Sequence, residues 1–393
     1  MNSIGASAKT PIHVIDPHSD GAWPDSVAPG LRRYLTALNG TGPERLVANA
    51  AGVRGEILRI GEAVMPVLVS DGAPGKASIL SPLGHHVRYP VEEIGRRVRG
   101  PGRLGLGALV APLAVAFRAG ALDRVAFVNH WLLSGAPAPD VPDDIWPAIL
   151  SYLAARHREH ALVIQDIKPS LQADLAHALR AAGAIAVPTR TVNIFDPAAP
   201  LEGKRFKKVR HSHSRGRRML RDAEGDLVPR EVALRQADTL ARLYRRSNIA
   251  RHSTLNPAYL PAFFEAALGC AEFRLQAWRA RGADDDRIAA FNLQRTDAGT
   301  IHWSTFGAEP DHPHQGGYYE RITYADLAAA KEQSLVLDWG AGAERFKRLR
   351  GAVPHAQIEM VFIAHLPARQ RVAWRLLARL RDLRRRQLDR RVG

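Results

Sequence analysis

Residues 272–338 contain an order of strands and helices that strongly limits the choice of fold. Three strand-like runs, separated by turns rich in Gly and Asp, predict an antiparallel meander. A helical pattern at 318–333 and a short apolar strand at 335–338 follow the meander. This order indicates an α/β (α+β) domain with a mixed central sheet flanked by helices. The three runs are 272–281, 287–295 and 299–307.

The first half of the chain has a similar order, although no sequence repeat is visible. Three short strand-like runs at 56–60, 65–70 and 76–80 precede alternating helices and strands that extend to residue 195. The recurrence predicts two tandem domains of one architecture. We expect a flexible leader at 1–45, an N-terminal domain at 46–200, a basic linking helix at 201–225, a C-terminal domain at 226–366 and a long basic C-terminal helix at 367–393.

Positive charge is concentrated in two segments of the chain. The formal net charge is +16. Residues 201–221 contain nine Lys or Arg and one Glu, and residues 369–391 contain ten Arg and two Asp. The formal charges of all other residues sum to zero. Clustered positive charge predicts an anion-binding surface for phosphate, nucleic acid or membrane, and a solvated basic face is the alternative.

The C-terminal basic segment also has apolar residues at helical spacing. Val372, Leu376, Leu380 and Leu383 form a stripe along a helix over 369–391. The favoured interpretation is that this stripe packs on the body of the protein. Peripheral contact with an anionic membrane and phosphate binding by the arginines are the alternatives.

Several classes of protein are excluded by the composition. The single Cys270 cannot form an intrachain disulfide or a cysteine-built zinc site, and no metal-ligand motif is present. The longest apolar stretch, 104–117, is too short to span a bilayer. The N-terminus lacks the apolar core of a signal peptide. We therefore expect a cytoplasmic protein without a metal cofactor or a transmembrane segment.

Residues 335–351 carry the most informative motif. An apolar strand ends in Asp338-Trp339-Gly340, and a Gly-rich turn leads to a short helix with Phe346-Lys347 and Arg350-Gly351. Upstream, Gly316-Gly317-Tyr318-Tyr319-Glu320-Arg321 precedes a helix, and a basic segment spans 204–221. This combination resembles the tandem GNAT-like acyltransferases of the Fem-type and BioF-like (CelD-like) acetyltransferase group.

The resemblance implies a role for each part of the motif. Lys347 would stabilise the oxyanion that forms during acyl transfer, and Phe346 would orient it by packing. Arg210, Lys207 and Lys208 would bind phosphates of a donor or acceptor. The remaining residues expected to bind substrate or donor are His302, Trp303, Gly316, Gly317, Tyr319 and Arg350. His302 is also a candidate general base.

The expected activity is N-acyl transfer from an activated thioester, either acyl-CoA or a carrier protein, to the amine of a small molecule. Gln315-Gly316-Gly317 only partly matches the pyrophosphate-binding loop of acetyl-CoA-dependent members. An aminoacyl-tRNA-dependent aminoacyltransferase, with tRNA as partner, is therefore a second hypothesis. A non-catalytic nucleic-acid or membrane-surface protein on the same scaffold is a third.

Overall fold

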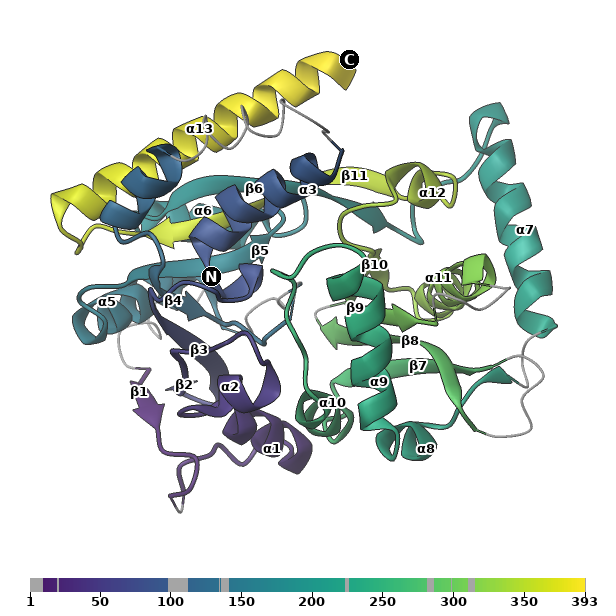
Figure 1. Cartoon of the computed structure of the whole chain (residues 1–393), viewed down its shortest axis with the longest axis horizontal. Helices are drawn as coiled ribbons and strands as arrows, with labels where there is room; N and C mark the ends of the chain where they lie inside the picture. Colours follow the sequence, from purple (N-terminus) through teal and green to yellow (C-terminus); the bar gives the residue numbers. More distant parts are fainter. Residues whose placement is uncertain are drawn as a thin grey trace, which may run out of the picture.

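The protein has one large mixed sheet covered by helices on both faces (Figure 1). The computed structural model describes residues 10–19, 21–97, 112–133, 135, 141–222, 226–280, 286–297, 299–309 and 315–392. The 11 strands follow the order β1-β2-β3-β4-β5-β11-β6-β10-β9-β8-β7. This confirms the predicted α/β class with a mixed sheet, flanking helices and a long C-terminal helix.

The elements of the described residues follow in chain order. The strands are β1 (Ile12–Ile15), β2 (Val53–Ile60), β3 (Ala63–Asp71), β4 (Arg124–Val128), β5 (Ala161–Ile167), β6 (Ile185–Phe195), β7 (Phe273–Arg279), β8 (Ile288–Asp297), β9 (Thr300–Ala308), β10 (Val336–Asp338) and β11 (Val353–Phe362). The helices are α1 (Pro29–Leu38), α2 (Gly42–Leu46), α3 (Tyr89–Arg97), α5 (Trp146–Arg156), α6 (Ala173–Ala181), α7 (Lys207–Arg221), α8 (Arg230–Leu234), α9 (Ala237–Tyr244), α10 (Pro261–Leu268), α11 (Gln315–Glu332), α12 (Glu344–Arg348) and α13 (Ala368–Val392).

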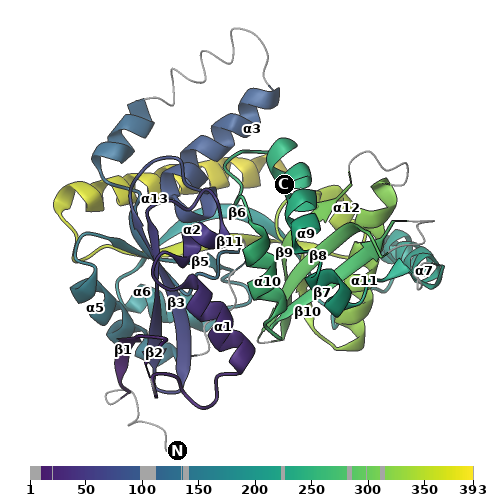
Figure 2. The ribbon, with the colours of Figure 1, turned by 60° about the horizontal axis from the view of Figure 1, so that its bottom comes forward.

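The two halves of the chain exchange strands in the middle of the sheet. β11, near the end of the chain, lies between β5 and β6 and is antiparallel to both. β6, from the first half, pairs in turn with β10 of the second half. Figure 2 shows β6 and β11 between the N-terminal strands and the C-terminal meander. Backbone hydrogen bonds therefore join the sheets of the two halves into one.

Part of the segment that was expected to be a loose leader belongs to the core. β1 pairs with β2 in antiparallel register, and α1 buries Tyr34, Leu35 and Leu38. The prediction of a strand at 76–80 is wrong, because Ser78–Leu80 form one helical turn. The backbone amides of Ala77 and Ser78 bond to loop carbonyls instead of a strand.

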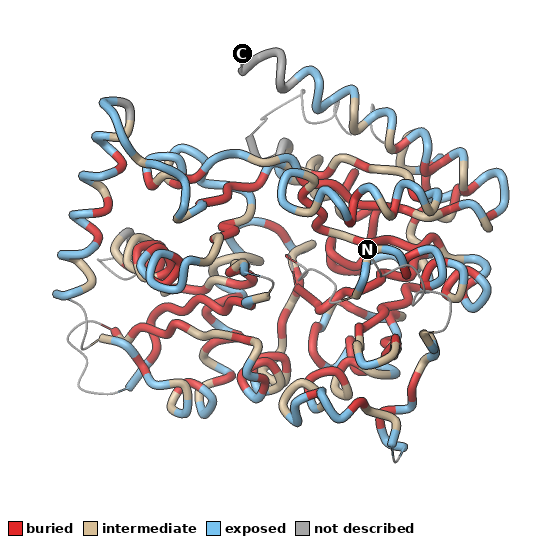
Figure 3. Tube along the Cα trace, turned by 180° about the vertical axis from the view of Figure 1, so that it is seen from behind, coloured by how far each residue is buried: buried red, intermediate tan, exposed pale blue. Residues whose placement is uncertain are grey.

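Helices cover both faces of the sheet. The largest apolar cluster packs α1, α2, α9 and α10 against strands of both halves. A second cluster packs α5 and α6 on the other face of the N-terminal strands. α11 packs with the C-terminal meander and with α7. Figure 3 shows that burial is concentrated in the strands and inner helix faces, whereas α13 has a continuous exposed side.

The two basic helices pack on the body through narrow faces. α7 buries Val209, His213 and Gly216, which recur at helical spacing, and exposes most of its basic residues. α13 buries Ala373, Trp374 and Leu377. The prediction that the stripe from Val372 to Leu383 packs on the body is wrong, because all four of its apolar side chains are exposed. Ala373, Trp374 and Leu377 recur at the same helical spacing and form the packed face.

Among the described residues, no helix is both long and apolar enough to cross a membrane. The sequence pattern also predicts a helix over 104–118. This range lies partly outside the described residues, and residues 112–119 are helical. The sequence pattern predicts another helix at 170–182, and the helix found there, α6, begins three residues later.

Candidate functional site

Strands β9 and β10 pair briefly and then separate. Residues 300–302 pair in parallel with residues 336–338. β9 then continues to Ala308, whereas β10 ends at Asp338. A register shift between β8 and β9 makes Ser304 an extra residue in the ladder. The backbone of residues 303–305 therefore has no partner strand on the β10 side within the described part of the chain.

Two hydroxyl groups lie unpaired in this part of β9. Ser304 Oγ and Thr305 Oγ1 are buried, and neither has a hydrogen-bond partner among the described residues. The next residue is already engaged, because Asn248 Nδ2 donates to the carbonyl of Phe306 at 2.6 Å. Buried polar groups normally have partners, so unpaired hydroxyls mark a position where a bound molecule can complete the hydrogen bonding.

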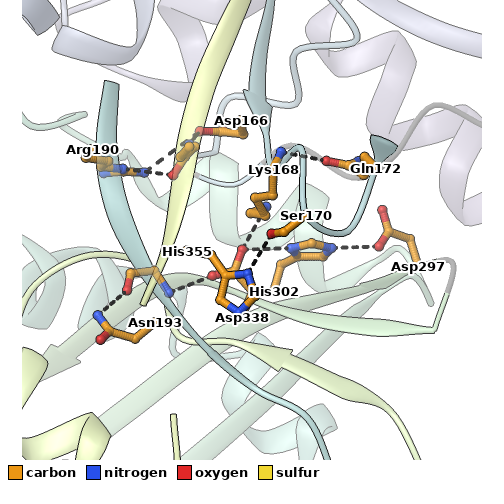
Figure 4. A network of polar contacts seen from close by, with 12 residues as sticks. Asp166, Lys168, Ser170, Gln172, Arg190, Asn193, Asp297, His302, Asp338 and His355 are labelled. Carbon is orange, nitrogen blue, oxygen red and sulfur yellow. Dashed lines mark hydrogen bonds and ion pairs between the residues drawn. The ribbon is translucent and has the colours of Figure 1, made fainter. Parts of the chain in front are cut away.

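A buried charged network lies at the point of separation (Figure 4). His302 Nε2 is 2.7 Å from Asp297 Oδ1, and His302 Nδ1 is 3.4 Å from Asp338 Oδ2. Lys168, which follows β5 of the N-terminal half, places its Nζ 2.8 Å from the same Asp338 oxygen. Side chains from both halves of the chain therefore meet at Asp338.

The network fixes the charge of its members. Burial alone would lower the pKa of His302, but hydrogen bonds to Asp297 and Asp338 outweigh it and raise that pKa. Burial likewise acts to raise the pKa of Asp338, and Lys168 and His302 together hold it well below its usual range. The raised pKa favours the protonated form of His302, which lies between the side chains of Asp297 and Asp338. In this arrangement it anchors the strands and has no free nitrogen to act as a base.

The N-terminal half contributes a second polar group beside this network. Asp166, at the end of β5, has a positive φ of 62° and accepts a hydrogen bond from Gln357 of β11. Ser170 Oγ and His355 Nδ1 are 2.6 Å apart. A cavity of about 490 Å³ adjoins this pair. Its lining includes Arg180, Pro188, Pro354, Asp382 and Arg385.

Aromatic rings form a wall over β9. The ring of Tyr319, in the first turn of α11, lies 5.6 Å from that of Trp303 and 5.4 Å from that of Phe306. Phe346 of α12 lies 5.1 Å from Tyr319 on another side. Trp303 and Phe306 flank Ser304 and Thr305 in the sequence. The wall therefore lies over the part of β9 that has lost its partner strand.

Tyr319 is chemically the most suggestive member of this wall. Burial raises the pKa of its phenol to about 12, so the hydroxyl remains protonated at neutral pH. No hydrogen bond joins this hydroxyl to any residue that the structure describes. The adjacent Tyr318 differs, because its hydroxyl donates to the carbonyl of Arg279 at 3.0 Å. Tyr319 can therefore donate a proton or a hydrogen bond to a bound molecule.

Arg350 supports the aromatic wall by stacking on Phe346. Its guanidinium carbon lies 3.3 Å from the ring centroid of Phe346, and Nη2 donates to Glu320 at 2.6 Å. The stacking holds Phe346 toward Tyr319. Arg350 is thus part of the site's support, and most of its guanidinium is engaged within the protein.

Asp326 of α11 is a buried carboxyl behind the wall. It accepts hydrogen bonds from Trp303 Nε1, Gln276 Nε2 and Asn292 Nδ2. Burial raises its pKa to about 7, although these hydrogen bonds act in the opposite direction. Since Trp303 donates directly to it, Asp326 fixes the orientation of the indole.

Lys347 is enclosed by its own loop. Its ammonium donates to the carbonyls of Trp339, Gly340 and Ala341 at 2.7, 3.2 and 2.9 Å. The side chain is 2% exposed, and burial lowers its pKa to about 8. An ammonium has three protons, so each is already used. The arrangement favours a role in holding the turn after β10.

The three basic residues expected to bind phosphate lie on α7. Lys207 and Lys208 are exposed in its first turn. Arg210 is exposed as well, but Nη1 donates to the carbonyls of Leu201 and Gly203 at 2.7 and 3.1 Å. The two lysines are therefore free to meet an anion, and Arg210 also caps the turn that precedes the helix.

The structure brings together most of the residues that the sequence indicates. His302, Trp303, Tyr319, Phe346, Lys347 and Arg350 surround the separation of β9 and β10. Gly316 and Gly317 lie in the first turn of α11, and no atom would lie within 4 Å of a Cβ added at Gly317. His312 and His314 precede Gly316-Gly317 in the sequence and are further candidates for a general base, and they lie outside the described residues.

Other site residues carry no motif. Lys168, Asp297 and Asp326 reach the site only through strand pairing and helix packing. Arg295 of β8 is also buried, with its guanidinium carbon 3.7 Å from the Trp131 ring centroid and Nε and Nη1 unpartnered. The one signal that could have indicated these positions is charge on otherwise apolar strands, as in 288–297.

The sequence of the C-terminal half matches a known domain family. Residues 207–348 match the family Acetyltransf_6, the acetyltransferase (GNAT) domain. The matched segment extends from α7 to α12 and includes β9, β10 and the aromatic wall. The chain therefore contains a GNAT acetyltransferase domain, and it is an acyltransferase. The resemblance drawn from residues 316–351 is confirmed.

Solved structures with a similar layout are distant in sequence. The C-terminal domain of a putative lysylphosphatidylglycerol synthetase from Agrobacterium fabrum is 15% identical, with a TM-score of 0.42 over 65% of this chain and 81% of that one. FemX is 10% identical, with a TM-score of 0.39 over 84% and 92%. A tandem GNAT protein from the clavulanic acid biosynthesis pathway is 12% identical, with a TM-score of 0.35 over 90% and 98%. No curated protein matches the chain.

Proposed function

We propose that this acyltransferase moves an acyl group from an activated thioester, acyl-CoA or a carrier protein, to the amine of a small molecule. The reaction takes place where β9 separates from β10. The observation that carries this proposal is the unpaired stretch 303–305, with two buried hydroxyls and the Tyr319 phenol beside it, inside the GNAT-matched segment.

The proposed chemistry is direct attack of the amine on the thioester. The amine nitrogen bonds to the carbonyl carbon, and the carbonyl oxygen becomes an oxyanion that hydrogen-bond donors along 303–305 stabilise. The carbon–sulfur bond then breaks, and the Tyr319 phenol gives its proton to the leaving thiolate. The attacking nitrogen releases its extra proton to solvent, and the Tyr319 phenolate takes up a proton from solvent to become a phenol again. Lys347 holds the turn 339–341 at the edge of this site.

The alternative donor is an aminoacyl-tRNA, an ester that the same chemistry would serve. The exposed basic side of α7 favours this alternative, because it gives the matched domain a surface suited to phosphates. A thioester donor such as acyl-CoA also carries phosphates, which Lys207 and Lys208 could meet. Charge alone therefore leaves both donor classes open.

Replacing Tyr319 with Phe tests the chemistry. Free thiol released from a panel of acyl-CoA thioesters, with mixed amines as acceptors, measures turnover. Tyr319→Phe is expected to lower kcat about 10²- to 10⁴-fold, because the leaving thiolate loses its proton donor. With a pKa of about 12, the phenol should cause no loss of rate through the ordinary working range of pH.

The matched control is Tyr318→Phe, which removes the neighbouring hydroxyl bonded to Arg279. This variant is expected to keep its kcat within a few-fold of the wild type. If Tyr319→Phe turns over as fast as Tyr318→Phe, the proposed proton donor is wrong. If thioesters are not consumed but aminoacyl-tRNA is, the donor is the alternative one.

A further inference from the structure

The exposed side of α13 combines apolar and basic residues in a way that the acyltransferase site does not use. Val372, Leu376, Leu380 and Leu383 recur every three or four residues along the helix, and they are 62%, 40%, 37% and 57% exposed. The helix packs on the sheet through a different face, formed by Ala373, Trp374 and Leu377. The stripe thus has no partner within the described chain.

Arginines border this stripe. Arg375 and Arg379 are exposed, and helical spacing puts Arg375 beside Val372 and Arg379 beside Leu376 and Leu383. Neither forms an ion pair with a described residue. Farther along, Arg385 and Arg386 pair with Asp382 at 2.9 and 2.8 Å. The apolar stripe is therefore next to two arginines that no acidic side chain of the described residues neutralises.

The inner side of the helix fixes its position on the body. Arg381 donates through Nε to the carbonyl of Pro188 at 2.9 Å and through Nη2 to that of Thr189. Trp374 is almost fully buried. α13 is thus held against β6. Figure 1 shows α13 lying along the outside of the molecule, and Figure 3 shows many exposed residues along it.

The charge selects among the occupants that could cover this face. A second copy of the same face would place arginines against arginines. Nucleic acid would offer phosphates to the arginines but would not bury the four exposed apolar side chains. An anionic lipid surface satisfies both features, because acyl chains accept the apolar residues and headgroups accept the arginines. We propose that α13 docks the protein on anionic membranes, lying in the plane of the interface.

Vesicle co-sedimentation tests the proposal with the full chain. The wild type is expected to sediment with phosphatidylcholine vesicles that contain about a third phosphatidylglycerol, and at least tenfold less with pure phosphatidylcholine. Leu376→Ser/Leu380→Ser should weaken binding at least tenfold, because both side chains are exposed and contribute apolar contact. Arg375→Gln/Arg379→Gln should weaken it about thirtyfold.

The basic helix α7 supplies the matched control. Arg217→Gln/Arg218→Gln removes the same charge from an exposed helix without an apolar stripe, and it should sediment like the wild type. If the α7 variant loses as much binding as the arginine variant of α13, membrane contact follows general charge and the proposal is wrong. Equal binding of the wild type to both kinds of vesicle would also overturn it.

A fluorescent label reports which residue enters the membrane. The native Cys270 is buried, so an exposed Leu380→Cys can be labelled selectively with an environment-sensitive dye. The dye at 380 should shift to the blue on anionic vesicles, whereas the same dye at Lys208→Cys should not. If instead Leu376→Ser/Leu380→Ser abolishes a dimer seen by light scattering and leaves vesicle binding unchanged, the stripe is a contact between two copies.

Discussion

At the scale of single residues, Lys347 shows how a buried charge can organise a site without touching the reacting atoms. Its ammonium holds three successive carbonyls of the turn after β10. That turn contains backbone in left-handed conformations, with φ of 64° at Gly340, 77° at Gly342 and 49° at Ala343. A non-glycine residue such as Ala343 is held in this conformation at a cost, and the lysine's hydrogen bonds help to offset it.

Lys347→Met separates a positioning role from direct stabilisation of an oxyanion. Methionine keeps the apolar length of the side chain but leaves the three carbonyls without their donor. The free energy of unfolding in urea should fall by about 1–3 kcal/mol. KM for the donor should rise together with the loss of stability.

The control is Arg348→Met, which changes the neighbouring exposed side chain and should leave both quantities near the wild type. A large fall in kcat with unchanged stability would contradict the positioning role. That outcome would assign Lys347 to the oxyanion, as the resemblance implies.

At the scale of elements, α7 is positioned by a close approach to α11. A Cβ added at Gly216 would lie 2.2 Å from the ring of Tyr324, so only glycine fits at this contact. Nearby, His213 Nε2 lies 2.9 Å from the carbonyl of Arg350 and Nδ1 lies 2.7 Å from Lys331 Nζ. These contacts fix the basic helix beside the residues that support the aromatic wall.

Gly216→Ala is expected to destabilise the protein although alanine is the better helix former. The clash with Tyr324 should cost about 1–3 kcal/mol. The gain in helix propensity from Gly to Ala is about 1 kcal/mol, so the clash should outweigh it. Thermal unfolding measures the net loss. Ser214→Ala, on the exposed side of the same helix, should change little. Higher stability of Gly216→Ala would show that the two helices do not pack this closely.

Local sequence patterns predicted the positions of helices and strands better than they predicted which side of a helix is buried. The meander from β7 to β9 and the helix α11 could be predicted, because turn sequences and helical periodicity are local signals. In α13 the periodicity correctly indicated a stripe from Val372 to Leu383. It could not show that Ala373, Trp374 and Leu377 pack instead, because that choice depends on the shape of the sheet beneath.

At the scale of the whole molecule, the exchanged strands explain why the site depends on both halves. Lys168 reaches Asp338 only because β11 and β6 bring the end of β5 next to β10. No sequence motif indicates this contact, since its partners are far apart in the chain and meet through long-range pairing. The motif at 335–351 could therefore locate the C-terminal half of the site and not its N-terminal contribution.

In the N-terminal half, β4 and β5 separate in a similar way. The reaction could therefore take place at either separation, and an experiment can distinguish the two. β4 and β5 pair in parallel from Val125 to Phe127, and β4 ends at Val128. His130, just beyond, already bonds the carbonyl of Ile79 at 3.0 Å and accepts from the amide of Leu132. The side chain there is satisfied, whereas Ser304 and Thr305 are not. We therefore assign the acyl donor to the C-terminal half.

Hydrogen–deuterium exchange with a bound donor analogue tests this assignment most directly. The analogue is a non-hydrolysable form of the donor that the turnover assay shows to be consumed, such as a CoA thioether. Binding of the analogue should slow the exchange of backbone amides at 303–306 and around Tyr319, and it should leave exchange at 128–132 unchanged. Protection at 128–132 without protection at 303–306 would contradict this assignment.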